Sequence, residues 1–238
     1  MILIGVLLDN IGQSTPTFGL IRVLQQIGIA YLLAFFIVER GWRWQLEAAV
    51  AILAGYHWLW THNPWNGPGG PWAEGGENIG RAFDRWLLGR NYSGNYVGLN
   101  AIPSTATVLF GALAGQLIAG LGRRSDTRSR LWTLCGLLMA GCLGVAAGWA
   151  SGFSAPLIKR IWTPSFAIYA GGWTTLMLAF FYGVIDVLAW RRWAFPLVVV
   201  GTNSLAAYVL ANSCGGLFRS ATGAWIGYGQ VAEKLAEY

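Results

Sequence analysis

The sequence predicts an all-α membrane protein: a bundle of about six full transmembrane helices, a partial first helix and a long external loop. Hydrophobic residues make up 55% of the chain and charged residues only 11%, whereas about a quarter of a soluble domain is charged. The mean hydropathy is +0.48. So few charges cannot cover a surface that faces water, so lipid must be the solvent for much of the chain.

Six stretches are long and apolar enough to cross a bilayer, which needs about 20 residues. They are expected over residues 22–39, 44–61, 101–121, 131–151, 164–189 and 194–213. The apolar start, Met1 to Leu8, is too short to span and lacks the basic leader and cleavage site of a signal peptide. We expect it to be the end of a helix, and residues 1–238 to form a single domain that is incomplete at both ends.

Short basic connections orient the bundle. Residues 39–43, 122–130 and 190–193 hold eight of the 16 Lys and Arg residues. With six spans, all three connections lie on one side, which is cytoplasmic because short cytoplasmic loops are enriched in Lys and Arg. Orientation therefore explains the net charge of +6, and no nucleic-acid partner is expected. Tryptophans are expected at the inner boundary (Trp42, Trp44, Trp132, Trp190, Trp193) and at the outer one (Trp58, Trp60, Trp162).

The connection 62–100 is then external and differs from the rest. Gly and Pro dominate its first half, which predicts irregular turns. Residues 80–89 (GRAFDRWLLG) place apolar side chains at helical spacing beside charges, which predicts a short amphipathic helix. Loops of this length in a compact protein are usually functional or disordered, and its many aromatic residues favour function.

Small residues recur every four positions, a spacing that lets transmembrane helices pack closely. They are Gly111 and Gly115, then Ala140, Gly144 and Gly148. Cys135 and Cys142 are seven positions apart on one expected helix, hence about 10 Å apart. That separation is too long for a disulfide, so we expect both to be small residues of the core.

Polar side chains inside the expected spans are the first candidates for function, because burying them unpaired costs several kcal/mol. Arg22, Gln25 and Gln26 share one helix face at i, i+3 and i+4. They could form a polar cavity wall near the outer boundary. Equally, Arg22 could extend to the interface while the glutamines bond a neighbouring helix.

The last span carries a second polar group. Asn203 lies near its middle, with Ser204 and Tyr208 close by. Asparagine in hydrocarbon faces a partner or a cavity. A substrate contact and a structural bond between helices are both compatible with this pattern.

Other titratable residues lie toward the span ends. Asp186 precedes Arg191 and Arg192, which favours an ion pair over contact with an anionic cofactor. His57 and His62 lie near the outer end of the second span. Imidazole is the commonest general base near neutral pH, but histidines among tryptophans more often fill the interface. No cluster of ligands predicts a metal site.

Five parts of the chain, in the correct order, resemble the heparan-alpha-glucosaminide N-acetyltransferase family and its bacterial relatives. They are RVLQQIGIAYLLA (22–34), GPGG (67–70) with GRAFDRWLLG (80–89), GLNAIPSTATVLFGALAGQLI (98–118), LIKRIWTPSFAIYAGGW (157–173), and YGVIDV (182–187) with FPLVVVGTNSLAAYV (195–209). The resemblance implies a multi-pass acyltransferase of the bacterial inner membrane. Members take an acetyl group from cytosolic acetyl-CoA and pass it to an external amino sugar.

The resemblance carries over a set of residues, with departures. The set is Arg22, Gln25, Asp84, Arg85, Asp186, Asn203 and Ser204. The family's catalytic histidine lies in an amino-terminal segment that this sequence does not contain, and neither His57 nor His62 matches it. Asn95 to Gly98 replace a family D-P-E-G, and Gln26 replaces an arginine.

The resemblance implies acetyl-CoA as donor and an external amino sugar or glycan as acceptor, and a homo-oligomer is compatible with it. We expect Gln25 and Asn203 to belong to a polar path, and Asp84 with Arg85 to hold the external loop. The alternative is a non-catalytic membrane binding or transport protein that retains the fold.

Overall fold

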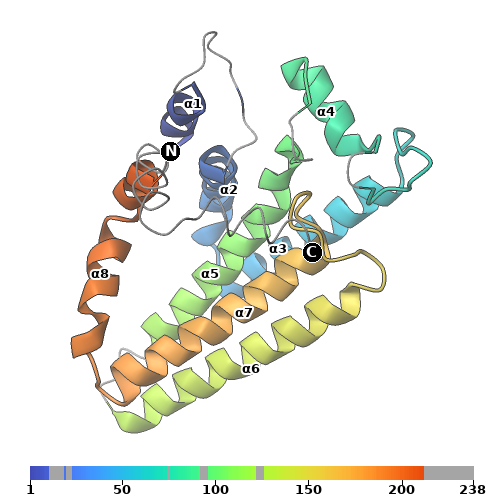
Figure 1. The fold of residues 1–238 in the computed structure, drawn as a ribbon. Helices are drawn as coiled ribbons and strands as arrows, with labels where there is room; N and C mark the ends of the chain where they lie inside the picture. The colour runs from blue at the N-terminus through green and yellow to red at the C-terminus, as the bar shows by residue number, and fades with distance from the viewer. Residues whose placement is uncertain (11–18, 20–22, 74–75, 92–95, 122–125, 212–238) are drawn as a thin grey trace, which may run out of the picture. The chain divides into compact units, whose positions relative to one another are not determined.

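The computed structural model of the chain describes all residues except 11–18, 20–22, 74–75, 92–95, 122–125 and 212–238. The model is 77% helical, and the part it describes contains no strand (Figure 1). The all-α prediction is confirmed. The chain divides into two compact units: Met1–Val6 with Thr17–Arg191, and Leu7–Pro16 with Arg192–Tyr238.

The larger unit holds most of the helices. They are α2 (Val23–Val38), α3 (Trp42–Thr61), α4 (Ile79–Leu88), the 3₁₀ turn η1 (Gly98–Asn100), α5 (Ala101–Leu121), α6 (Thr127–Ser151), α7 (Pro164–Tyr182) and the π-helical turn η2 (Gly183–Val187). The smaller unit holds η3 (Arg192–Ala194) and α8 (Phe195–Thr202), and α1 (Ile2–Asn10) belongs partly to each unit.

Three helical stretches are long and apolar enough to cross a membrane: Gly98–Gly120, Thr127–Ser151 and Pro164–Val187. A fourth span results if Arg192–Thr202 and Ser204–Ala211 cross together, although they meet at an angle of 72°. These three to four helices indicate an integral membrane protein. The 16-residue α2 is apolar but shorter, and α3 carries charged and indole side chains along its length. Six full spans are therefore not confirmed.

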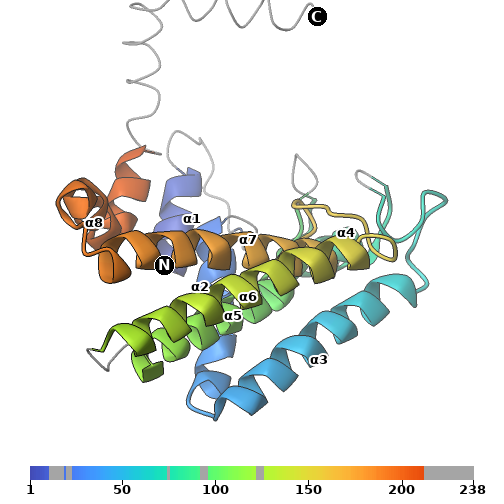
Figure 2. The ribbon, with the colours of Figure 1, turned by 90° about the horizontal axis from the view of Figure 1, so that it is seen from below.

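The helices α6 and α7 approach each other more closely than any other pair. A Cβ atom added to Gly144 would lie 2.8 Å from the Cα atom of Gly172, and one added to Gly172 would lie 2.7 Å from the carbonyl carbon of Gly144. Gly148 meets the backbone of Tyr169 in the same way. The close packing predicted for Gly144 and Gly148 is confirmed. Both views show the two helices side by side (Figures 1 and 2).

The same prediction is wrong for Gly111 and Gly115. A Cβ atom added at either position would meet nothing within 4 Å, because both glycines lie on an exposed face of α5. Cys135 and Cys142 are free, as predicted, but exposed. Their expected place in the core is wrong, because the buried face of α6 is taken by Thr133, Leu137, Gly141 and Gly148.

The core of the larger unit forms around α5, which packs against α2, α3, α6 and α7. Small side chains dominate where these helices cross, with Ala34, Ala49, Ala106 and Ala167 all nearly inaccessible. At the other end of α3, Trp60 is fully buried and stacks on Trp72. Trp60 therefore belongs to the core, and its expected position at the outer membrane boundary stays a prediction.

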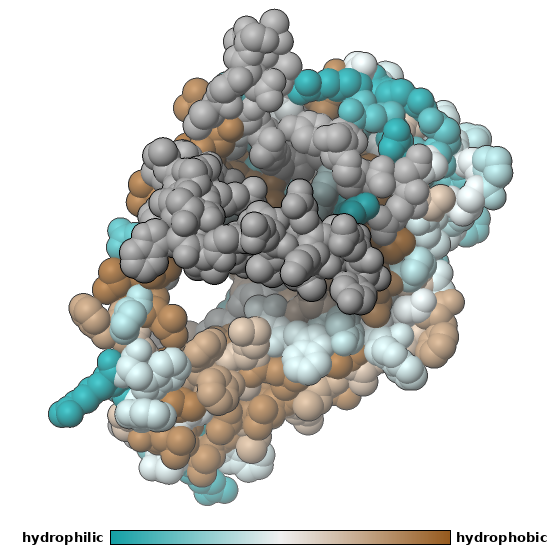
Figure 3. Space-filling model, in the orientation of Figure 1, coloured by the Kyte–Doolittle hydropathy of each residue, from teal (hydrophilic) through white to brown (hydrophobic). Residues whose placement is uncertain are grey.

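The surface agrees with a lipid environment. Large apolar side chains of α6 and α7 are exposed, among them Leu138, Met139, Leu143, Met177 and Phe180. Figure 3 shows apolar residues over these two helices and hydrophilic residues around α4. In water such a surface would associate or aggregate, whereas in a bilayer it contacts lipid chains.

Candidate functional site

A buried polar cluster joins α2 to the start of α5. The amide nitrogen Nε2 of Gln26 donates a hydrogen bond to the hydroxyl of Ser104 and a weaker one, at 3.5 Å, to the carbonyl oxygen of Asn100. Ser104 in turn donates to that same carbonyl at 2.7 Å. All three side chains are less than a tenth exposed. We call Gln26, Asn100 and Ser104 the α2–α5 polar cluster.

Asn100 extends the cluster toward the connection between α6 and α7. Its Nδ2 atom donates to the carbonyl oxygen of Arg160 at 2.7 Å. The hydroxyl of Tyr56 on α3 donates to the next carbonyl, that of Ile161, at 2.9 Å. The Oδ1 atom of Asn100 is buried and accepts no hydrogen bond from the described residues. It is a buried acceptor that an N–H or O–H group could use.

The two glutamines of α2 have different surroundings. Gln25 is fully buried and donates from Nε2 to the carbonyl oxygen of Gly19 at 3.3 Å. Its side chain packs on α1, where a Cβ atom added to Gly5 would lie 2.7 Å from it. Gln26 makes the bond to a neighbouring helix that one of the two interpretations of this face expects. Arg22, the third residue of that face, lies outside the described residues.

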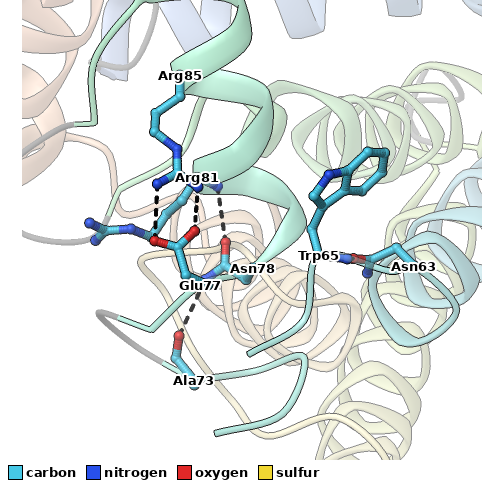
Figure 4. A network of polar contacts seen from close by, with 7 residues as sticks. All are labelled: Asn63, Trp65, Ala73, Glu77, Asn78, Arg81 and Arg85. Atoms are coloured by element: carbon cyan, nitrogen blue, oxygen red, sulfur yellow. Dashed lines mark hydrogen bonds and ion pairs between the residues drawn. The ribbon is translucent and has the colours of Figure 1, made fainter. Parts of the chain in front are cut away.

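The 62–100 loop contains the predicted amphipathic helix, which is α4. Asn78 caps its first turn by accepting from the backbone N–H of Arg81 at 3.0 Å, and Gly89 ends it in the left-handed region at φ 68°. Arg85 forms a two-pronged ion pair with Glu77, which precedes the helix (Figure 4). Since both side chains are about half exposed, the pair contributes little stability by itself.

Asp84 fixes α4 to the chain that leads into α5. Both of its carboxylate oxygens accept from the backbone N–H of Gly98, at 3.0 and 3.2 Å, and the side chain is 1% exposed. Burial raises the pKa of Asp84 to about 6, although the bond from Gly98 and the nearby Arg81 both lower it. Asp84 therefore places η1, and with it Asn100, relative to the 62–100 loop.

The described contacts of the two histidines are with residues outside the α2–α5 polar cluster. The His57 ring lies 5.7 Å from the ring of Trp72. His62 is exposed, stacks on Trp58 and lies with Nδ1 2.7 Å from the hydroxyl of Thr61. Neither histidine forms a hydrogen bond to a carboxylate or to a buried hydroxyl of the cluster among the described residues. Their contacts are those of interfacial side chains.

The expected cytoplasmic ion pair is present but long and exposed. The guanidinium of Arg191 lies 3.8 Å from the carboxylate of Asp186 and also donates to the carbonyl oxygen of Ile185. Arg130 of α6 donates to the backbone carbonyl of Asp186 at 3.0 Å. These bonds tie α6 to the π-helical turn η2. Arg192 begins the smaller unit.

Asn203 lies in that smaller unit, at the break between its two helices. Its Nδ2 atom donates to the carbonyl oxygen of Val199 at 3.0 Å, one turn earlier. Asn203 and Ser204 are exposed, and Tyr208 is half-buried. The described bonds of Asn203 are therefore local, and a polar path that includes it together with Gln25 stays a prediction.

Asn100 and Ser104 were not singled out from the sequence. The available signal was their spacing of four, directly before an apolar stretch, which places both on one helix face. Chemically, the cluster offers a hydroxyl, an amide oxygen and backbone carbonyls, so it can bind and orient a polar group. Among the described residues it includes no base beside the hydroxyl, and no His, Cys, Asp and Glu group is arranged to hold a metal ion.

Comparisons with protein-family models, with curated proteins and with solved structures found no match to this chain.

Proposed function

We propose that this chain is the membrane-embedded part of an acyltransferase that resembles the heparan-alpha-glucosaminide N-acetyltransferases. It would move an acetyl group from cytosolic acetyl-CoA to an amino sugar or glycan on the external face. The observation that supports this proposal best is the α2–α5 polar cluster, Gln26, Asn100 and Ser104. It lies buried in a mostly apolar bundle and adjoins α4 of the 62–100 loop through η1 and Asp84.

In this proposal the cluster and Gln25 bind the acceptor. The Oδ1 atom of Asn100, buried with no donor among the described residues, would accept from the amino group of the sugar. Asp84 and Arg85 hold the loop that covers the acceptor. From the sequence, Arg22, Asn203, Ser204 and Tyr208 are the further candidates for a polar path. Asp186, Arg191 and Arg192 lie on the donor side, where the arginines attract the phosphates of CoA.

The chemical step in this proposal needs a base that the described contacts do not supply. The amino-terminal segment of the family provides a histidine, and the printed sequence does not contain that segment. We therefore assign to this chain the binding of acceptor and donor, and we assign the proton transfer to such a histidine.

The topology belongs to the same proposal. Six spans in a bacterial inner membrane would place 62–100 outside and 39–43, 122–130 and 190–193 inside, in agreement with the positive charge of the latter three. A cysteine-free protein with Pro68→Cys or Arg128→Cys tests this. An impermeant maleimide added to intact cells should label the first variant and not the second. Labelling of both, or only of Arg128→Cys, would reject the orientation.

A second candidate is a non-catalytic membrane binding or transport protein with the same fold. The polar cluster favours it, since its described side chains can bind a polar group but include no base beside the Ser104 hydroxyl. The two candidates differ in one respect: the second binds an amino sugar or glycan without transferring acetyl to it.

The deciding experiment joins the protein to a family amino-terminal segment that supplies the catalytic histidine, and incubates it in nanodiscs with radiolabelled acetyl-CoA and glucosamine. The acyltransferase proposal expects labelled N-acetylglucosamine, and Asn100→Leu should lower kcat/KM about tenfold, the equivalent of one lost hydrogen bond. Thr174→Val is the matched control, because the Thr174 hydroxyl bonds only its own helix, to the carbonyl of Ala170. Binding of glucosamine without any transfer would favour the second candidate.

A further inference from the structure

An apolar groove opens on the larger unit between α3, α5, α6 and α7. Its volume is about 680 Å³, within the range of roughly 300–1,000 Å³ that small-molecule sites occupy. Its walls include Phe110, Leu113 and Leu117 of α5 with Leu137 and Ala140 of α6. Gln116 and Thr175 are its polar exceptions, and the hydroxyl of Thr175 is satisfied by the carbonyl of Gly171 at 2.8 Å. The groove is thus suited to a hydrocarbon chain.

The groove exists because small residues alternate with large ones along its walls. Gly144, Gly171 and Gly172 line it without side chains. A Cβ atom added to Gly171 would lie 3.2 Å from the ring of Phe110, so that ring would have to shift by a few tenths of an ångström. The close α6–α7 contact brings these glycines together, and leaves the larger side chains to form the rim.

The end of the groove wall that α3 forms lies beside an arginine. Trp42 and Leu46, at the start of α3, line that end. The guanidinium carbon of Arg43 lies 5.4 Å from the centre of the Trp42 ring. An indole with an arginine against it is typical of the depth at which lipid headgroups lie. The groove therefore combines an apolar interior with an arginine against one of its lining indoles.

We propose that this groove binds one acyl chain of an anionic phospholipid, with the phosphate beside Arg43 and Trp42. The arginine beside one wall and the apolar interior match such a lipid. A second copy of this chain is the competing occupant, and the cross-linking experiment below distinguishes the two.

The first test uses the whole protein in phosphatidylcholine nanodiscs that contain a trace of phosphatidylglycerol with a photoreactive diazirine on one acyl chain. We expect labelling to concentrate on the groove walls, at Phe110, Leu113 and Leu117. Equal labelling of the exposed side chains Met139 and Leu143, which lie outside the groove, would overturn the proposal.

Two variants test the binding of the acyl chain and the binding of the lipid headgroup separately. Ala140→Phe fills the groove and should remove most of the labelling, whereas Ala146→Phe, an exposed position of the same helix outside the groove, should not. Arg43→Gln should lower the preference for phosphatidylglycerol over phosphatidylcholine probes about fivefold, the factor that one basic residue near a membrane surface contributes. Arg128→Gln is its control. Unchanged labelling in Ala140→Phe, or an unchanged preference in Arg43→Gln, would reject the site.

A photoreactive benzoylphenylalanine at Leu113 identifies the occupant directly. A covalent adduct with the mass of one phospholipid supports the proposal. A cross-link to protein, whether to a second copy or to another part of the same chain, would overturn it.

Discussion

The contact between α6 and α7 should be intolerant of a single added methyl group. In Gly172→Ala, the new Cβ atom would lie 2.7 Å from the carbonyl carbon of Gly144 and 2.9 Å from the carbonyl oxygen of Gly141. The nearest atom is the backbone nitrogen of Val145, at 2.4 Å, and ordinary contact begins at 3.4 Å, so the helices must separate by about 1.0 Å. A gap of that size forfeits roughly a quarter to a half of each van der Waals contact beside it.

Every atom in the way belongs to the backbone, so no side-chain rotation relieves the clash. Overpacking of this kind costs about 1–3 kcal/mol. We expect Gly172→Ala to lower the midpoint of thermal unfolding, measured in detergent by fluorescence-detected size exclusion. Gly115→Ala is the matched control, because its Cβ atom would meet nothing within 4 Å. If the two variants unfolded at the same temperature, the close α6–α7 approach would be refuted.

Three further predictions concern the loop and the polar cluster. The pKa of Asp84 is raised to about 6, so the folded state binds more protons than the unfolded state between about pH 4 and 6, and the free energy of unfolding should fall as pH rises through that range. Asp84→Asn should remove this dependence in thermal melts from pH 4 to 7. If the free energy of unfolding varied equally with pH in both proteins, the prediction would be wrong. Ser104→Ala leaves the Gln26 amide without its hydroxyl partner and should cost about 1–3 kcal/mol; the double variant Gln26→Leu with Ser104→Ala should recover part of that loss in the same melts, and strict additivity would argue against the bond. In Gly89→Ala the alanine must adopt a left-handed backbone, which should lower the stability of α4 by about 1–2 kcal/mol and speed proteolysis of the 62–100 loop. Gly55→Ala inside α3 is the control, because its Cβ atom would meet nothing within 4 Å.

Much of the helix pattern could be predicted from the sequence, because apolar length and loop chemistry are local properties. The expected span 101–121 coincides with α5, and the amphipathic pattern at 80–89 coincides with α4 within one residue at each end. The spacing of residues along a helix does not show toward which neighbour that face of the helix points. Gly111 and Gly144 belong to the same kind of repeat, yet only Gly144 faces another helix, and that depends on how α5 and α6 are rotated.

The last expected span shows a different limit. Residues 194–213 are apolar enough to predict one helix, but the structure bends by 72° after Thr202. The hydroxyl of Thr202 donates to the carbonyl of Val198 at 2.9 Å, and Asn203 donates to that of Val199. Side chains that bond the preceding turn compete with the helical backbone and bend helices. The polar residues predicted to lie inside a span thus lie where that span breaks.

The candidate site was predictable only in part, for a related reason. Gln26 was found because it is polar within an apolar helix. Ser104 and Asn100 escaped notice because they precede an apolar stretch, where polar residues are common. Their burial arises from tertiary contacts, with Gln26 of α2 on one side and the carbonyl of Arg160 on the other. Such contacts join residues 60 to 78 positions apart, beyond the reach of any local pattern.

The backbone contact between α6 and α7 also bears on how the protein responds to mechanical force. Where Gly144 and Gly148 meet Gly172 and Tyr169, lipid cannot enter between the helices, because the backbones already touch. Pulling on one helix must either shear this contact along its length or carry the second helix with it. When one of these helices is pulled with an atomic-force microscope, we expect α6 and α7 to leave the membrane together as a hairpin, in a single unfolding step.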